Sequence, residues 1–226
     1  MYQKKKEGTL RIVPAILTND KQDLELKIHQ ASKFAALSQI DVMDGIFVPS
    51  HSVGYSELGP IKTNMELEIH LMVIKPQDYF EGYKNAGAKR IIFHFEATDK
   101  PAQLLKQLKE MELEAGIAIN PETPVISILP FLNDLDMLLL LAVNPGFYGS
   151  PFIPSVLDKA RELSSIFASN AKPPVLALDG GVKPDNILDI YRSGVTQAVV
   201  GSAMFKGDPE ENYNNFLEKI SLNMIV

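Results

Sequence analysis

The feature that most constrains the fold is an alternation of short apolar runs and amphipathic stretches, repeated eight times along the 226 residues. The apolar runs are rich in β-branched and aliphatic residues, and helical patterns such as Pro154–Phe167 and Pro209–Ile220 lie between them. Continuous apolar character predicts parallel strands that are covered by helices on both faces. The predicted strands are residues 10–16, 37–42, 67–72, 90–95, 113–119, 136–143, 174–179 and 197–201.

Eight strand–helix units without a linker-like segment predict an α/β fold, a single (β/α)8 TIM barrel. The alternative is a doubly wound open sheet, but no G-x-G-x-x-G motif follows the first predicted strand. We expect residues 1–8 to form a polar N-terminal extension and residues 9–226 to form one barrel domain.

Composition excludes several classes of function. The formal charge of −6 and the isoelectric point near 5.3 argue against nucleic acid as a partner. The absence of cysteine excludes disulfides, thiolate zinc sites and cysteine nucleophiles. No apolar run reaches the length of a membrane span, and Pro14 interrupts the only early apolar segment, so we expect neither a membrane partner nor a signal peptide. A cytoplasmic location is the default expectation.

In a TIM barrel the chemistry is found at the carboxyl ends of the strands. Asp41 ends the second predicted strand, His70 closes the third, Asn144 follows the sixth, Asp179 ends the seventh and Gly201 follows the eighth. A closed barrel brings these distant segments to one rim.

Asp41 and Asp179 are expected to face one another across the barrel mouth. Two carboxylates on opposite sides of a substrate can remove a carbon-bound proton from one face and return one to the other. His70 could join them in binding a divalent cation, which would stabilise the developing oxyanion. Each aspartate taken alone is equally well explained as a helix cap or a loop-binding residue.

Three glycine-bearing turns, at 144–150, 178–184 and 200–205, follow the last three predicted strands. Glycine allows a close approach of the backbone, whose amides can then point at an anion. The loops after strands seven and eight are the recurrent phosphate site of this fold, so a phosphorylated small molecule is the expected ligand.

Taken together, these segments resemble the ribulose-phosphate 3-epimerase family from about Arg11 to Glu218. The motifs that carry the resemblance are "IDVMDGIFVPS", "IHLMV", "NAGAKRIIFHFEA", "AINPETP", "AVNPGFYGSPFI", "LDGGV" and "VGSAMF". The resemblance implies a ribulose-phosphate-binding barrel, inversion at C3 of a ketose phosphate through a 2,3-enediolate, and a homo-oligomer.

The resemblance also implies roles for individual residues. Asp41 and Asp179 fall on the acid–base pair, which also binds a divalent cation (Zn, Mn, Mg or Fe), and His70 falls on a metal ligand. Met43 and Met72 match methionines beside the enediolate, whose polarisable sulfurs tolerate a shifting charge. The expected substrate and phosphate contacts are Met43, Met72, Asn144, Gly146, Gly149, Ser150, Gly180, Gly181, Gly201 and Ser202.

The sequence departs from the family pattern near the site. Gln39 stands where the family has a metal-binding histidine, and it shares a strand face with Asp41. An amide oxygen suits hard ions better than zinc, so we expect weaker zinc binding, with a preference for magnesium or manganese or with no bound metal. The other departures are Ala15, Ile46, Tyr55 and Leu141, together with the segment Tyr148, Gly149 and Ser150, which stands where the family has Gly-Gly-Gln.

Three functions are compatible with this pattern. The favoured one is a ketose-phosphate 3-epimerase that interconverts D-ribulose 5-phosphate and D-xylulose 5-phosphate. The second is a related epimerase that acts on another ketose phosphate, such as allulose 6-phosphate. The third is a non-catalytic protein that binds a sugar phosphate.

Overall fold

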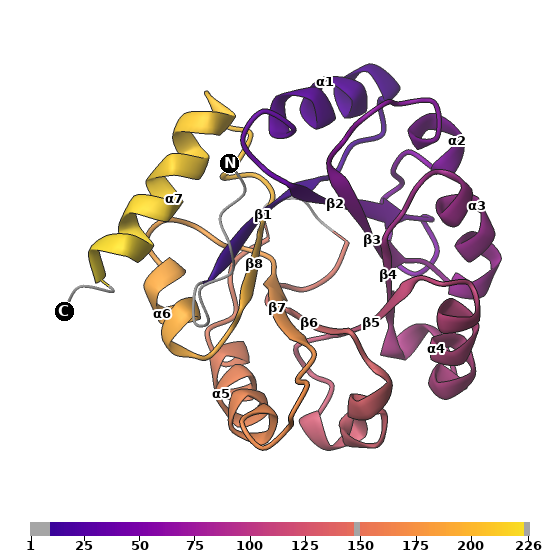
Figure 1. Cartoon of the computed structure of the whole chain (residues 1–226), viewed down its shortest axis with the longest axis vertical. Helices are drawn as coiled ribbons and strands as arrows, with labels where there is room; N and C mark the ends of the chain where they lie inside the picture. Colours follow the sequence, from indigo (N-terminus) through magenta and orange to yellow (C-terminus); the bar gives the residue numbers. More distant parts are fainter. Residues whose placement is uncertain (1–9, 147–149, 224–226) are drawn as a thin grey trace.

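The chain closes into a barrel of eight parallel strands, with the helices outside it (Figure 1). This computed structural model describes residues 10–146 and 150–223. The strands are neighbours in chain order from β1 to β8. They are β1 Arg11–Ile16, β2 Leu37–Met43, β3 Glu66–Met72, β4 Arg90–His94, β5 Glu114–Ile119, β6 Met137–Leu141, β7 Val175–Asp179 and β8 Gln197–Val200.

Pairing of β1 with β8 closes the barrel. Arg11 to Pro14 of β1 lie in register with Gln197 to Val200 of β8. An open sheet would leave the edges of two strands unpaired, so the doubly wound alternative is wrong and the TIM barrel is confirmed. The predicted extension over residues 1–8 lies outside the described residues, and the division at residue 8 stays a prediction.

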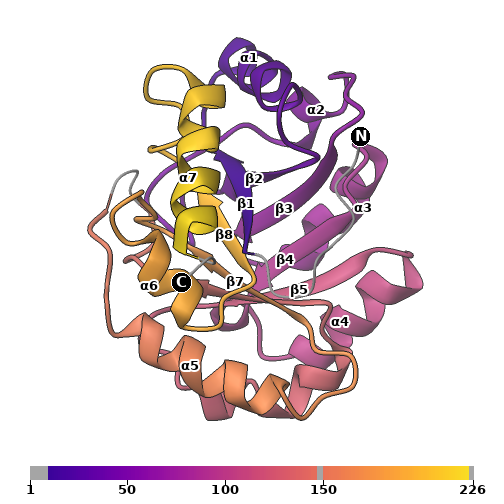
Figure 2. The ribbon, with the colours of Figure 1, turned by 60° about the vertical axis from the view of Figure 1, so that its left-hand side comes forward.

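The helices cover the outer face of the strands, and α7 packs beside both α1 and α6 (Figure 2). Their apolar sides and the outward-facing strand residues form the main hydrophobic core. Among the described residues, no helix combines the length and apolar character that crossing a bilayer requires. The α-helices are α1 Lys21–Ala31, α2 Tyr55–Leu58, α3 Phe80–Asn85, α4 Pro101–Glu110, α5 Val156–Phe167, α6 Ile187–Arg192 and α7 Pro209–Asn223.

The expectation of a helix after every strand is wrong for the fifth unit. Between β5 and β6, a stretch described throughout, the chain forms only two 3-10 helices, η3 Val125–Ser127 and η4 Leu129–Asp134. Pro121, Pro124 and Pro130 punctuate this segment. Each proline lacks an amide hydrogen and clashes with the preceding turn of an α-helix, so no long helix can form there. The remaining 3-10 helices are η1 Pro76–Tyr79 and η2 Phe95–Ala97.

Inside the barrel, alternate residues of each strand form layers of different character. The floor is polar, because the buried Glu68 carboxylate accepts hydrogen bonds from Arg90 Nη1 at 2.6 Å and from Gln197 Nε2 at 2.7 Å. Above it lies an apolar layer, and the acidic and histidine side chains come last, at the carboxyl ends. The apolar cluster comprises Ala15, Ile92, Ala118, Met137, Leu139, Ala177 and Val199.

Candidate active site

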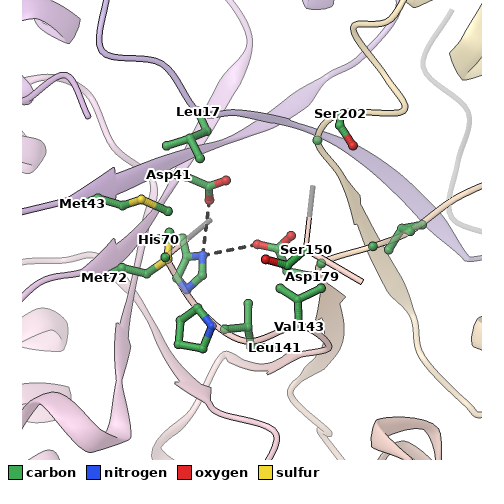
Figure 3. A pocket seen from close by; sticks show the side chains of 16 residues that line it. Leu17, Asp41, Met43, His70, Met72, Leu141, Val143, Ser150, Asp179 and Ser202 are labelled. Atoms are coloured by element: carbon green, nitrogen blue, oxygen red, sulfur yellow. Dashed lines mark hydrogen bonds and ion pairs between the residues drawn. The ribbon is translucent and has the colours of Figure 1, made fainter. Parts of the chain in front are cut away.

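A pocket opens at the carboxyl ends of the strands, where the barrel interior meets the surface (Figure 3). Its walls come from the carboxyl ends of six different strands or from the loops that follow them. The lining residues are Leu17, Asp41, Met43, His70, Met72, Leu141, Val143, Pro145, Gly146, Ser150, Asp179, Gly180, Gly181, Val182, Gly201 and Ser202. The fold therefore gathers the glycine-bearing turns and the acids at the strand ends around one cavity.

The centre of the pocket is a buried group of two carboxylates and one imidazole. Nδ1 of His70 lies 3.3 Å from Oδ1 of Asp41 and 3.3 Å from Oδ2 of Asp179. The three side chains turn toward one another from β2, β3 and β7 (Figure 3). Because β2 and β7 lie on different sides of the barrel, the two carboxylates approach the pocket from separate walls.

Gln39 lies beneath this group and is fully buried. Its amide nitrogen donates to Asp41 Oδ1 at 2.8 Å and to Asp179 Oδ2 at 2.7 Å, so one side chain joins the two carboxylates. Its other amide atom, Oε1, has no hydrogen-bond partner among the described residues. A buried polar atom without a partner costs free energy, on the order of 1–3 kcal/mol, which is a reason to look for a missing ligand.

The three titratable groups perturb one another. Burial raises the pKa of Asp41, and the neighbouring charge of Asp179 raises it further. Burial alone would lower the pKa of His70, but hydrogen bonds with Asp179 and Asp41 outweigh it and raise the pKa to about 9. In the absence of another cation, an imidazolium at His70 therefore offsets the charge of the buried acids.

The same group fits a divalent cation. Asp41, His70 and Asp179 each offer one ligand atom, and these atoms all lie within 4.8 Å of one another. Two carboxylate oxygens and an imidazole nitrogen are ligands that zinc, manganese and iron accept. The unpartnered Gln39 Oε1 is a fourth candidate, because exchange of the two amide atoms would turn an oxygen toward the cation. A cation would also take the place of the proton on His70 Nδ1.

The turn after β7 requires glycine at two consecutive positions. Gly180 and Gly181 have φ angles of +104° and +63°, which other residues rarely adopt. A Cβ on Gly180 would lie 2.7 Å from the Val143 side chain, and one on Gly181 would lie 2.9 Å from the Cβ of Phe152. Both glycines are therefore required by the conformation and the packing of the turn that lines this side of the pocket.

Asp44 secures the loops on the opposite side. Its Oδ1 accepts hydrogen bonds from the amides of Ile46 and Phe47, both at 2.8 Å, and its Oδ2 accepts one from the amide of Ile74 at 2.7 Å. One carboxylate thus joins the loop after β2 to the loop after β3. Met43 and Met72, which end these two strands, lie together along this wall (Figure 3).

The structure brings most of the residues singled out in the sequence into this pocket. Asn144 is an exception, because its side chain is exposed and does not line the cavity. Gln39 lies behind the lining, whereas Gly149 and Tyr148 fall outside the described residues. The other residues named as substrate or phosphate contacts all line the pocket.

Sequence reasoning missed several apolar lining residues. Leu17 and Val143 each lie at or just beyond the end of a predicted strand, and that position was the available signal. Pro145 and Val182 lie within two of the glycine-bearing turns. Their apolar side chains gave no indication of a ligand, because such residues are usually explained by packing.

Comparison with known proteins settles the family. The model of the ribulose-phosphate 3-epimerase family matches residues 11–205, which is most of the chain. The chain belongs to this family. Membership confirms the family that the sequence motifs predicted. It also confirms that the protein is an isomerase, a ketose-phosphate 3-epimerase.

Several curated members of the ribulose-phosphate 3-epimerase family resemble this chain over nearly its full length. The ribulose-phosphate 3-epimerase of Synechocystis sp. is 35% identical, covering 93% of this chain and 91% of its own. The ribulose-phosphate 3-epimerase of Buchnera aphidicola is 37% identical, with 92% of each chain covered. The Bacillus subtilis enzyme of the same name is 35% identical over 87% of this chain and 92% of its own.

Solved structures with lower identity support the fold alone. A 3-keto-L-gulonate-6-phosphate decarboxylase from Vibrio cholerae superposes with a TM-score of 0.72 at 15% identity, covering 95% of this chain and 98% of the other. A thiamine phosphate pyrophosphorylase from Pyrococcus furiosus gives a TM-score of 0.63 at 13% identity, covering 95% of this chain and 97% of its own.

Proposed function

We propose that this epimerase interconverts D-ribulose 5-phosphate and D-xylulose 5-phosphate by proton transfer between two aspartates. The observation that carries the proposal is the position of Asp41 and Asp179, which line one pocket from separate walls beside a glycine-bearing turn. The names of the curated relatives support the choice of a ribulose phosphate. The reaction would place the protein in the pentose phosphate pathway.

In the proposed mechanism one aspartate removes the proton from C3 and the other returns a proton to the opposite face of the same carbon. The carbonyl at C2 acidifies that proton, and the intermediate is a 2,3-enediolate. Met43 and Met72 pack along one wall and exclude water from the intermediate. Burial and the mutual repulsion of the acids keep the pKa of Asp41 raised, which makes it a better proton acceptor.

The phosphate of the substrate is assigned to the turns after β7 and β8. Gly180, Gly181, Gly201 and Ser202 lie on that side of the pocket, away from the methionine wall. Backbone amides and the Ser202 hydroxyl can donate hydrogen bonds to phosphate oxygens. The support is that the loops after strands seven and eight are the usual phosphate site of this fold.

Asp41, His70 and Asp179 would hold a divalent cation, with Gln39 as a weaker fourth ligand. A cation bound there would stabilise the negative charge that develops on the substrate oxygens. The amide at position 39 supports a preference for Mg²⁺ or Mn²⁺ over Zn²⁺, because amide oxygens are hard ligands.

Proton exchange in D₂O tests the proposal directly. We expect the purified protein to incorporate deuterium at C3 of ribulose 5-phosphate, with NMR as the readout. Asp179→Asn should slow the conversion of ribulose 5-phosphate to xylulose 5-phosphate by several orders of magnitude, because inversion needs both carboxylates and an amide cannot transfer the proton, while inorganic phosphate still binds. Near-normal conversion by Asp179→Asn would remove this residue from the catalytic pair.

The same assay separates the alternative functions. Exchange with allulose 6-phosphate but not with the pentulose would favour the related epimerase. Binding of both sugar phosphates without any exchange would favour the non-catalytic protein.

The proposal includes a cytoplasmic homo-oligomer. The support is the resemblance to the family rather than any interface in the chain. Light scattering on the purified protein would give the subunit number, and cell fractionation would give the location.

A further inference from the structure

A second histidine lies directly behind His70. His94, at the end of β4, is fully buried, and its Nε2 lies 3.0 Å from Nε2 of His70. The two rings stack with centroids 5.1 Å apart, and Phe47 packs against the ring of His94 at 4.9 Å. At this distance one of the two nitrogens must carry a hydrogen and the other must accept it.

Glu96 determines the direction of this hydrogen bond. Its Oε2 lies 3.2 Å from Nδ1 of His94, and an ionised carboxylate can only accept. Burial alone would raise the pKa of Glu96, but hydrogen bonds from His94, Thr123 and the amide of Asn120 outweigh it and lower the pKa to about 2. Glu96 is therefore ionised, and Nδ1 of His94 carries the hydrogen.

The position of the hydrogen on His94 fixes the direction of the next hydrogen bond, which joins His94 to His70. Because Glu96 holds the hydrogen of the fully buried His94 ring on Nδ1, its Nε2 is left as the acceptor. Nε2 of His70 must therefore donate. The remaining nitrogen of His70, Nδ1, is the one that lies 3.3 Å from both Asp41 and Asp179.

We infer that Glu96 and His94 are positioning residues that keep a proton on Nε2 of His70, so that Nδ1 can bind a divalent cation between Asp41 and Asp179. The inference rests on the metal site of the proposed function. A histidine that binds a metal commonly donates its other N–H to a partner that fixes its tautomer, and here the partner is a second histidine held by a carboxylate.

Two further hydrogen bonds fix the orientation of the Glu96 carboxylate. Oε1 accepts a hydrogen bond from the Asn120 amide at 2.9 Å and another from the Thr123 hydroxyl, both beyond the end of β5. Oε2 is thereby left facing His94. A role in packing alone would need only an apolar ring at position 94, without an anchored acceptor beyond it.

Glu96→Gln tests the inference with little change in shape. The amide oxygen of glutamine can take the hydrogen bonds from Asn120 and Thr123, which leaves its NH₂ group facing Nδ1 of His94. That donor would reverse both hydrogen bonds. Nδ1 of His94 would accept, Nε2 of His94 would donate to Nε2 of His70, and the hydrogen of His70 would move to Nδ1. Glu122→Gln is the matched control, because it removes the same charge from an exposed side chain nearby.

Titration calorimetry with Zn²⁺ should show binding that is about 10–100-fold weaker in Glu96→Gln than in Glu122→Gln. Long-range ¹H–¹⁵N NMR of the Zn²⁺-loaded wild type should find the His70 proton on Nε2. Equal affinity in the two variants, or a proton on Nδ1 in the loaded wild type, would overturn the inference. Titration with Mn²⁺ gives the same comparison if the wild type does not bind Zn²⁺, and a wild type that binds neither ion would overturn the metal site itself, which is a distinguishable result.

Substitution of His94 gives an independent test if Glu96→Gln does not fold. The amide oxygen of His94→Gln can still accept from Nε2 of His70, so Zn²⁺ affinity should stay within a few-fold of wild type. His94→Leu offers no acceptor, and its affinity should fall by about 10–100-fold. Equal losses in the two variants would show that the ring acts only by packing and would overturn the inference.

Discussion

At the scale of single residues, Gln39 distinguishes this chain from the family pattern. Its amide nitrogen donates to both catalytic candidates, Asp41 and Asp179, and so holds the acids together without a metal. A histidine at this position could offer an imidazole lone pair to a soft cation. The glutamine therefore bridges the two acids, and we expect its amide to bind zinc less tightly than an imidazole would.

Replacement of Gln39 by histidine should raise the affinity for Zn²⁺ by at least about tenfold, because imidazole is the better zinc ligand. Elemental analysis after dialysis and titration calorimetry give the measurement. The wild type should retain less than one equivalent of zinc after the same treatment. Stoichiometric zinc in the wild type would contradict the expected weakness of the Gln39 site.

The sequence was sufficient to select these residues but not to place them. Asp41, His70 and Asp179 could be chosen because each ends an apolar run, which is a local signal. The hydrogen bond from Gln39 to Asp179 spans 140 residues, and such a separation leaves no trace in spacing. His94 lies within an apolar run, so its sequence position indicates only an interior residue, and its contact with His70 exists only because β3 and β4 pair.

At the scale of elements, the turns after β7 and β8 use glycine for different reasons. Gly181 combines a φ of +63° with a close contact to Phe152, so its role is conformational. Gly201 lines the pocket, its φ is not positive, and a Cβ there would meet no atom within 4 Å. A methyl group at position 201 would therefore occupy space that a ligand needs.

Gly201→Ala should fold normally yet bind phosphate at least about tenfold more weakly, since the added methyl group narrows the cradle without straining the backbone. Calorimetry with inorganic phosphate and with ribulose 5-phosphate measures the effect. Gly181→Ala is the contrasting variant, and its thermal midpoint should fall because of backbone strain. Unchanged phosphate affinity in Gly201→Ala would assign the phosphate elsewhere.

Element boundaries show where sequence periodicity succeeded and failed. Each of the eight strands was predicted within a few residues, because burial on both faces produces continuous apolar runs. The segment between β5 and β6 also repeats apolar residues at helical spacing, but its prolines exclude an α-helix. In this segment the prolines, a local signal, override the regular repeat of the fold.

At the scale of the whole molecule, the polar floor of the barrel is a buried charge network. Glu68 is fully buried and Arg90 nearly so, and the Arg90 guanidinium also contacts Glu114 through Nη2. Burial raises the pKa of Glu68, and the charge of Arg90 opposes that shift. The active-site pocket and the polar floor lie in the same barrel interior, but their hydrogen bonds join different residues.

Arg90→Met should lower the free energy of unfolding by about 3–5 kcal/mol, because it leaves the Glu68 carboxylate buried without its cation. Urea denaturation gives the measurement, with Lys106→Met in the exposed pair with Glu110 as a control that should change little. The double variant Arg90→Met/Glu68→Leu should recover much of the loss. If the free energy of unfolding of Arg90→Met falls by less than about 1 kcal/mol, water must reach the Glu68 carboxylate.

The bridging carboxylate of Asp44 has a consequence for ligand exchange. Because three amides from two loops share this anchor, the wall that carries Met43 and Met72 is arranged before any sugar arrives. The entropy of ordering that half of the cavity is lost once, during folding, and not again in each catalytic cycle.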